Sequence, residues 1–562
     1  LKIVLSLLCS AVFAGILFYF MLPALNFKSY DLYIYLGAIV ASYVVFNALF
    51  SNVFGKPEYV PYVKRRAIVP GIIIAVLLVA VGIGYLVSCE FFRASSYRII
   101  SVDTDSNFSE DIEEQTADSF SEIPKLDEDT AAQLAARALG ALKDIGSVSQ
   151  FTIAPENSQI NYQGKPYRVV PLQYADIIKW LVNTREGFPG YVMVNMADES
   201  TNFVELKDGS IRYSAYEHFN KLLKRHLRFE FPTYLFADAT FEVNDDGNPF
   251  WICARLDKTI GLFGGTDVIG IVLVDAVSGE CIEYSMDQLK DDPNLQWIDR
   301  VYDSDLIVQQ YNYYGKYQKG FWNSLLGQKD VIKTTDGYNY IAKNDDVWMY
   351  TGVTSVTSDQ SIIGFVLVNQ RTKEADFYNV TGGTEYSAQQ AAEGRVMDLG
   401  YTATFPLLLN IGGEPTYFLS LKDPKNQIVQ QYALINVANY NNNKMGVTGT
   451  DLSKCLASYI ESLKEKGITV DINPDDVVTP GTNEDKTPDT TKLTASGTIA
   501  DIRTAVMGGE SYYYIKLDSN EAYFAIAASK DESVVILNRG DSVTVTYSGE
   551  GSIINADSIK KN

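Results

Sequence analysis

Histidine is almost absent from this chain: His218 and His226 are the two in 562 residues. They are eight positions apart, slightly more than two helical turns, which is too far for them to share a metal ion. The sequence also has no G-x-S-x-G, no H-E-x-x-H and no phosphate loop ending in Lys-Ser or Lys-Thr. We therefore expect no catalytic residues, no cofactor and no metal site, and we expect the chain not to be an enzyme.

Basic residues are outnumbered by acidic ones, 47 to 69, so the formal net charge is −22. Proteins that bind nucleic acid need a basic footprint, and we do not expect a nucleic-acid partner. One basic cluster occurs outside the apolar amino-terminal region, on a helix predicted from Tyr216: Lys221, Lys224, Arg225 and Arg228. A solvated helix face explains it most simply, and contact with lipid head groups, an acidic segment or an acidic partner is the alternative.

Cysteine is also scarce, with five residues. Cys9 and Cys89 belong to the apolar amino-terminal region, and Cys455 lies on an amphipathic helix and is expected in a core. Cys253 and Cys281 fall on the first and third strands of one predicted sheet. A disulfide between them and two buried thiols remain equally open.

Long apolar runs, in contrast, are present three times: Ile3 to Leu22, Leu32 to Phe50 and Ala67 to Val87. Each is close to the ~20 residues that cross ~30 Å of hydrocarbon. The first run has no clear signal-peptidase site, so residues 1–92 are predicted to be three membrane-spanning helices, with a cleaved signal peptide as the alternative for the first.

The loops between these runs give an orientation. The second loop holds Lys56, Lys64, Arg65 and Arg66, whereas the first holds Lys28 beside Asp31. The positive-inside rule places the second loop and the amino terminus in the cytoplasm. We expect a bacterial plasma-membrane protein whose large carboxy-terminal region is extracytoplasmic.

A pattern of turn, apolar strand and short strand then occurs four times between residues 129 and 470. The best copy runs from Gly247 to Tyr284; the others begin at the turns Gly164, Gly337 and Gly413 and continue with GYVMVN at Gly190, GFVLVN at Gly364 and QYALIN at Gln431. The apolar strands end in Asn195, Asp275, Asn369 and Asn436, and a helix-compatible run precedes each copy. This predicts four tandem α+β repeats, each a helix with three antiparallel strands.

The repeat resembles the PepSY domain, from about Asp129 to Val447, in its Ala-rich helix and in a meander whose last turn reads VDAVSGE. PepSY-like modules are found outside the membrane as protease inhibitors, propeptides and partner-binding domains. The resemblance carries no catalytic residues. It implies a role in protein binding.

The acidic residues 93–128 are expected to form a solvated stalk, or a loosely packed extension of the first repeat, and residues 471–492 an extended linker. Residues 493–562 alternate as short strands and resemble the OB-fold, a small β-barrel. Its aromatic residues, Tyr512, Tyr514 and Phe524 among them, are candidate partner contacts.

Three residues in the middle strand of the second repeat predict how the repeats pack. Val272 and Val274 share one face of the strand and Leu273 lies on the other, yet all three are apolar. Both faces of the sheet must therefore be covered, so the repeats should stack on one another or on another chain.

The sequence thus predicts a membrane-anchored extracytoplasmic binding or scaffold protein of the bacterial envelope. Its partners would be envelope or membrane proteins, including itself. The alternative function is regulation or inhibition of an envelope protease.

Overall fold

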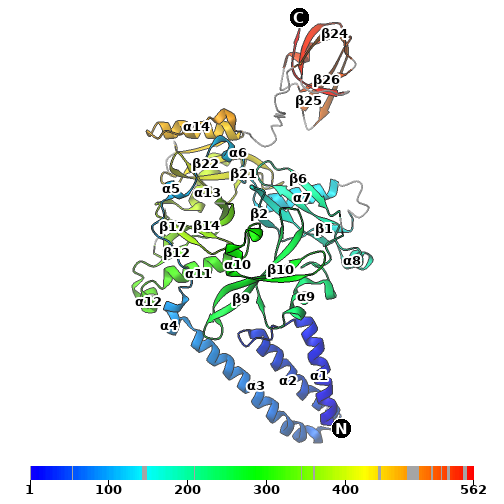
Figure 1. The fold of residues 1–562 in the computed structure, drawn as a ribbon, viewed down its shortest axis with the longest axis vertical. Coiled ribbons are helices and arrows are strands. Elements are labelled where there is room, and N and C mark those ends of the chain that lie inside the picture. The colour runs from blue at the N-terminus through cyan, green and yellow to red at the C-terminus, as the bar shows by residue number, and fades with distance from the viewer. Residues whose placement is uncertain are drawn as a thin grey trace. The chain divides into compact units, whose positions relative to one another are not determined.

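The computed structural model describes residues 2–53, 55–141, 149–207, 209–343, 345–357, 361–440, 445–477, 493–507, 510–520, 522–527, 532–547 and 553–561. The chain is mixed α and β and divides into two compact units, Leu1–Gly481 and Thr482–Asn562. The first unit contains the apolar helices and the repeats (Figure 1).

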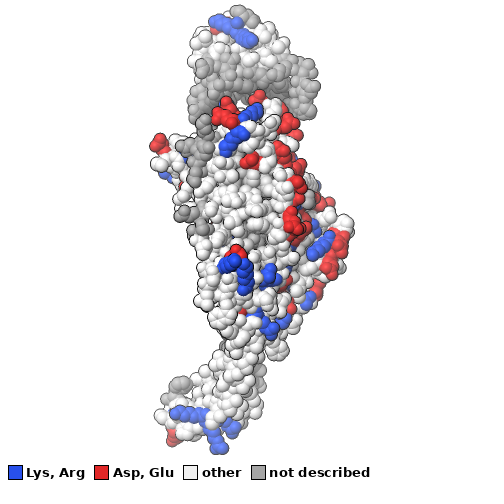
Figure 2. Space-filling model, turned by 90° about the vertical axis from the view of Figure 1, so that its left-hand side faces the viewer, with Lys and Arg blue, Asp and Glu red and all other residues white. Residues whose placement is uncertain are grey.

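Three amino-terminal helices are long and apolar enough to cross a membrane, as predicted: α1 (Lys2–Met21), α2 (Tyr30–Phe50) and α3 (Val60–Ser88). α2 packs against both α1 and α3. Lys and Arg side chains gather at the helix ends remote from the repeats, where Lys56, Lys64, Arg65 and Arg66 are exposed (Figure 2). These helices form a membrane anchor by length and composition.

Each repeat is an antiparallel meander of four strands, one more than the sequence predicted. The four sheets are β2 (Ser158–Tyr162), β3 (Lys165–Val170), β5 (Gly190–Asn195), β6 (Thr201–Glu205); β8 (Thr240–Val243), β9 (Pro249–Ile260), β10 (Gly264–Asp275), β11 (Cys281–Ser285); β13 (Asn339–Lys343), β14 (Asp346–Ser355), β16 (Gly364–Asn369), β17 (Ala375–Tyr378); and β20 (Leu407–Ile411), β21 (Glu414–Lys422), β22 (Val429–Asn436), β23 (Gly446–Gly449). Short strands extend the last three sheets: β7 (Leu235–Phe236), β12 (Ile332–Thr334) and β19 (Thr402–Ala403). Two further pairs are β1 (Phe151–Ile153) with β4 (Leu172–Tyr174), and β15 (Ser361–Ile362) with β18 (Gly382–Gly383).

The sequence alignment of the third repeat was wrong by one strand. Gly337 precedes β13, the first strand of the meander, whereas Gly164, Gly247 and Gly413 precede the second strand of theirs. The true equivalent is the turn at Asp345, which has a left-handed φ of 66°. That turn contains no glycine, the residue on which the sequence comparison depended.

The residue that ends each third strand makes the same turn in all four repeats. The side-chain oxygen of Asn195 accepts the amide of Ala197 at 2.8 Å, and Asp275, Asn369 and Asn436 accept those of Val277 at 2.8 Å, Arg371 at 2.8 Å and Asn439 at 3.0 Å. Asn and Asp favour such turns because their short side chains bond backbone two or three residues on. The recurring Asn or Asp in the sequence is therefore a turn signal.

Helices cover the sheets. They are α7 (Glu128–Ala141), α8 (Ile177–Asn183), α9 (Leu223–Glu230), α10 (Met286–Asp291), α11 (Ser304–Lys316), α12 (Gly320–Trp322), α13 (Glu385–Arg395) and α14 (Leu452–Lys464). The helix predicted from Tyr216 is shorter than expected, because Phe219–Lys221 form a 3₁₀ turn, η3, before α9 begins. α14 closes the fourth repeat and buries Cys455, as predicted.

Each apolar core is shared by consecutive repeats. Val272 and Val274 pack in one core with the first sheet, α7 and α9, whereas Leu273 packs in a second core with α11 and the third sheet. The third sheet repeats this division, with Val366 and Val368 in the second core and Leu367 in a third core with the fourth sheet. The prediction that both faces of these sheets are covered by neighbouring repeats is confirmed.

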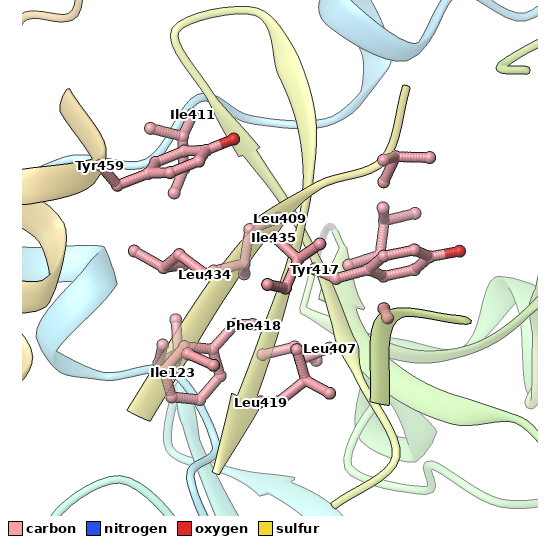
Figure 3. Packing of buried hydrophobic residues seen from close by; sticks show 14 of the residues in the cluster. Ile123, Leu407, Leu409, Ile411, Tyr417, Phe418, Leu419, Leu434, Ile435 and Tyr459 are labelled. Atoms are coloured by element: carbon pink, nitrogen blue, oxygen red, sulfur yellow. The ribbon is translucent and has the colours of Figure 1, made fainter. Parts of the chain in front are cut away.

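The predicted acidic stalk is wrong, because residues 93–128 pack across the repeats. Their short helices α5 (Phe108–Asp111) and α6 (Ala117–Ser121) bury Phe108 and Phe120 in the core of the fourth repeat. Figure 3 shows Ile123 among Phe418 and Leu419 of that core. The many acidic residues face outward while the widely spaced apolar ones face inward, which a composition argument does not detect. α4 (Glu90–Arg93) and the 3₁₀ turn η2 (Ala94–Tyr97) join this segment to α3.

The predicted linker begins later than expected. Ile472 and Val477 are buried in the core of the fourth repeat, around the 3₁₀ turn η7 (Pro474–Asp476). The rest of the predicted linker, 478–492, lies outside the described residues.

The carboxy-terminal unit consists of five strands, β24 (Leu493–Met507), β25 (Glu510–Leu517), β26 (Tyr523–Ala527), β27 (Ser542–Tyr547) and β28 (Ile553–Lys561), and a 3₁₀ turn, η8 (Glu532–Ile536). They pair in a closed ring in the order β24-β25-β26-β28-β27, with β26 and β28 parallel. The ring encloses its own apolar core, which includes Ile515, Phe524 and Val543.

Candidate binding site

A cavity of about 430 Å³ is lined by residues of all four repeats. Its walls come from Leu126 in the segment that precedes the repeats, Arg168 in the first repeat, Thr240 in the second, Arg300 and Tyr340 in the third, and Leu407 and Phe418 in the fourth. A volume of this size falls within the range of small-molecule sites. The cavity is thus a product of the stacked arrangement and not of any one repeat.

The first strands of the repeats converge around this cavity. The Asn161 amide group on β2 donates to the Asp345 carboxylate of the third repeat at 2.7 Å, and the Tyr162 hydroxyl on β2 donates to the Asp245 carbonyl of the second at 3.3 Å. The fourth repeat returns to the first, because Arg137 on α7 donates to the Asn426 carbonyl at 3.3 Å and Lys422 pairs with Asp127. The row of repeats therefore closes on itself.

Two guanidinium groups line the interior of the cavity. Arg168, on β3 and 6% exposed, donates to the Asn157 side-chain oxygen at 2.6 Å and lies 3.6 Å from the Glu128 carboxylate. Arg300 donates to the Tyr340 hydroxyl at 3.4 Å and stacks on that ring. Burial lowers the pKa of Arg168, although the guanidinium stays charged at any physiological pH. The Nε atoms of both residues have no hydrogen-bond partner among the described residues.

Two buried carboxylates stand behind Arg300. Glu242 on β8 accepts the amides of Asp299 at 2.9 Å and Arg300 at 3.0 Å, and Asp299 accepts the amide of Asn161 at 2.6 Å. Burial raises the pKa of Glu242 to about 7, and burial together with the Glu242 charge raises the pKa of Asp299. Through these bonds the pair connects β8 to the backbone at Asp299 and Arg300 and connects that segment to the backbone of β2, so it stabilises the walls of the cavity.

The rim of the cavity is acidic and exposed. Glu128, Glu156, Asp238 and Asp303 lie there with exposed side chains. The cavity therefore has cationic groups inside and carboxylates at its mouth. Neither histidine and no cysteine occurs among the described residues that line it.

The predicted basic cluster has a different role from the expected solvated face. Arg228, 7% exposed, donates to the Leu22 carbonyl at 3.1 Å, and Arg225 donates to the Tyr19 carbonyl at 3.1 Å, both at the end of α1. Cations suit the last carbonyls of a helix, which are left without intrahelical partners. Lys221 lies over the Tyr213 ring, and Lys224 is exposed. The two arginines therefore join the anchor to the repeats.

The Gly-rich turn between β9 and β10 docks against the same anchor. The amides of Leu262 and Phe263 donate to the Ser88 hydroxyl of α3 at 2.8 and 2.9 Å. The Phe263 ring stacks on Tyr30 of α2 with 4.1 Å between centroids. A side chain at Gly84 would collide with Phe263 at 2.5 Å, which explains the small residue there.

In the carboxy-terminal unit, the prediction for Phe524 is wrong, because this side chain is fully buried in the barrel core. Tyr512 and Tyr514 alternate with inward-facing Tyr513 and Ile515 on β25 and are half-buried. Tyr514 and Tyr512 thus lie on the outer face of the strand, where contact with a partner stays a prediction.

The sequence left the cysteine pairing open, and the structure contains free thiols. β10 separates Cys253 from Cys281: Val272 pairs with Cys253 on one side of that strand, and Val274 pairs with Cys281 on the other. No group of three or more potential metal ligands occurs among the described residues.

The cavity itself was not predicted. Arg168 and Arg300 are single basic residues in unrelated sequence contexts, 132 positions apart, and only the closed arrangement of repeats brings them together. One local feature of the sequence could have indicated the site: the charged Arg168 occupies the otherwise apolar end of β3.

No known protein family matches the chain, and no curated protein matches it. Among solved structures, an α-L-arabinofuranosidase from Lactobacillus brevis aligns over 71% of this chain and 92% of its own, with 7% identity and a TM-score of 0.15. An overlap this poor carries no information about fold or activity.

Proposed function

We propose that this chain is a membrane-anchored extracytoplasmic protein of the bacterial envelope that binds protein partners through its stacked repeats. The observation that carries the proposal is the charged cavity on which all four repeats converge. Its acidic rim and buried arginines are complementary to a polypeptide segment bearing charges of both signs.

The anchor supports a scaffold role. Arg225, Arg228, Phe263 and Ser88 fix the repeats to the membrane helices through both side chains and backbone. A body held this way presents the cavity at a constant height above the bilayer. The basic loop at Lys56 to Arg66 supports a cytoplasmic position for the remote helix ends.

The resemblances named from the sequence support the same class of function. A helix on a meander with a recurring Asx turn is compatible with a PepSY-like repeat, and the five-stranded ring is compatible with an OB-like barrel. Both names remain part of the proposal. Neither implies a reaction.

The test is site-specific photo-crosslinking from intact membranes, with the crosslinker placed at Glu156 on the cavity rim of the full-length chain. We expect a reproducible protein adduct, and a crosslinker at exposed Ser458 on α14 serves as the control position. Absence of any partner or self-adduct specific to the rim would contradict the proposal. An adduct with an envelope protease, combined with its inhibition by the full chain, would assign the alternative regulatory function.

A further inference from the structure

Five large apolar side chains lie exposed beside the end of the membrane anchor nearest the repeats. Phe91 and Phe92 on α4 are 49% and 61% exposed, and Trp322, Leu325 and Leu326 are 61%, 60% and 77% exposed. Soluble surfaces rarely gather such side chains without a partner. We call these five residues the apolar shelf.

The shelf is one surface made by two distant parts of the chain. The Phe91 ring lies 5.7 Å from that of Trp322 and 5.1 Å from that of Phe321. Leu325 and Leu326 follow on the π-helical turn η5 (Asn323–Gly327), directly after α12. Figure 1 places α4 and α12 together at the body end of α3.

Polar contacts fix the shelf to the repeats. The Glu90 carboxylate accepts the Lys316 ammonium at 3.0 Å and the Tyr313 hydroxyl at 3.1 Å, and it also accepts the hydroxyl of Tyr317. These three partners lie on α11 or directly after it. The shelf therefore keeps its place relative to both α3 and the third repeat.

The level of the shelf follows from the length of the apolar part of α3. The run from Ala67 to Val87 has a helical length of roughly 30 Å, which equals the thickness of the hydrocarbon. The hydrocarbon edge then falls near Val87, four residues before Phe91. Tyr30 and Tyr33, in ring contact with Phe263, lie at the corresponding end of α2 and suit an interfacial aromatic belt.

From this continuity we propose that the apolar shelf inserts into the interfacial layer of the bilayer leaflet that faces the repeats. Trp favours this layer because its ring is apolar and its N–H is polar, and leucines enter the acyl boundary beneath it. Basic residues border the shelf: Arg93 and Lys329 have exposed side chains, and exposed Lys319 pairs with Asp330. Such cations suit phosphate head groups. The inference does not depend on which protein partner the cavity binds.

The test uses the full chain in nanodiscs made with brominated lipids, which quench nearby tryptophan. The spans contain no tryptophan, and Trp251 and Trp348 are buried in the repeats. We expect bromolipid to quench a clear fraction of wild-type fluorescence, and Trp322→Phe to remove most of that quenching. Trp297→Phe, a half-buried residue packed on Phe250, is the matched control and should retain it.

Equal fractional quenching of Trp322→Phe and wild type would overturn the proposal. So would efficient crosslinking between copies of a Leu326→Cys variant at low protein density, because a second copy would then cover the shelf. Leu325→Ser with Leu326→Ser should fold normally and weaken the quenching of Trp322.

Discussion

The second and third repeats share a core and differ at one end of their central hairpin. In both, the third strand ends in an Asx turn, at Asp275 and Asn369, and its apolar residues divide between two cores. β10, however, extends from Asp275 back to Gly264, whereas β16 begins at Gly364, only five residues before Asn369. The additional length carries Phe263 to the membrane helices. The common part of the repeat therefore builds the stack, and its local extension connects the stack to the anchor.

The largest effect is expected from a change in the common part of the repeats, the shared core. Val272 is fully buried between the first and second repeats, so Val272→Asp places an unpaired charge in that core. The cost is several kcal/mol, comparable to the whole stability of a domain, and we expect loss of folded protein by urea titration in nanodiscs. Ile282→Asp, at an exposed position of the edge strand β11, is the control and should lower the free energy of unfolding by less than about 1 kcal/mol. A normally folded Val272→Asp variant would contradict the assignment of this core.

Leu273→Asp should affect the opposite core. This side chain packs with α11 and the third sheet, so the variant should loosen the contact between repeats and leave the β9–β10 ladder partly intact. Hydrogen exchange should increase in α11 and β16 before it increases in β9. A variant as stable as the parent in every peptide would end the stacked interpretation.

The buried carboxylates Glu242 and Asp299 should make the stability of the folded chain depend on pH. The pKa of Glu242 is raised from 4.5 to about 7 in the folded chain, so the folded state binds more protons than the unfolded state between these values. Its contribution is fully present below pH 4.5 and is lost as pH rises toward 7, by up to roughly 3 kcal/mol at 1.36 kcal/mol per unit. Asp299 acts in the same direction.

Glu242→Gln should flatten this part of the stability profile. The measurement is the difference in urea midpoint between pH 5 and pH 7.5, compared with that of the parent. An unchanged difference would show that Glu242 does not carry the proton.

The smallest effect concerns the extension unique to the second repeat. Phe263→Ala removes ring contacts with Tyr30 and Tyr33, each kind of pair contributing about 0.5–1.5 kcal/mol beyond its buried area. We expect faster exchange at the hairpin tip while the sheets keep their stability. Ile269→Ala, at a more exposed site on β10, should change neither. Global destabilisation by Phe263→Ala would mean that the anchor contributes to the core itself.

Sequence reasoning identified the features that depend on local pattern. Apolar runs and turn residues were enough to predict the three apolar helices, α14, and the third strands at Gly190, Gly270 and Gly364. Each of those glycines lies where a side chain would meet a backbone carbonyl of the neighbouring strand. A constraint of this kind restricts the residue type at a single position, so it can be recognised in the sequence.

Features that depend on distant contacts were missed. β2 reads as polar because Gln159 and Asn161 face other repeats, and the acidic segment hides Phe108 and Phe120 among its carboxylates. Arg168 and Arg300 line one cavity only because the folded chain brings the first and third repeats together. The contact of Arg225 and Arg228 with α1 likewise could not be predicted without the fold.

The central claim is that four repeats form one cooperative body around a shared cavity. Hydrogen exchange of the full chain in nanodiscs across a urea series tests it directly, through peptides covering β5, β10, β16 and β22. Because each core is shared by consecutive sheets, we predict that all four strands lose protection in one step. Loss of protection in one of these strands at clearly lower urea, with the other three still protected, would contradict the account.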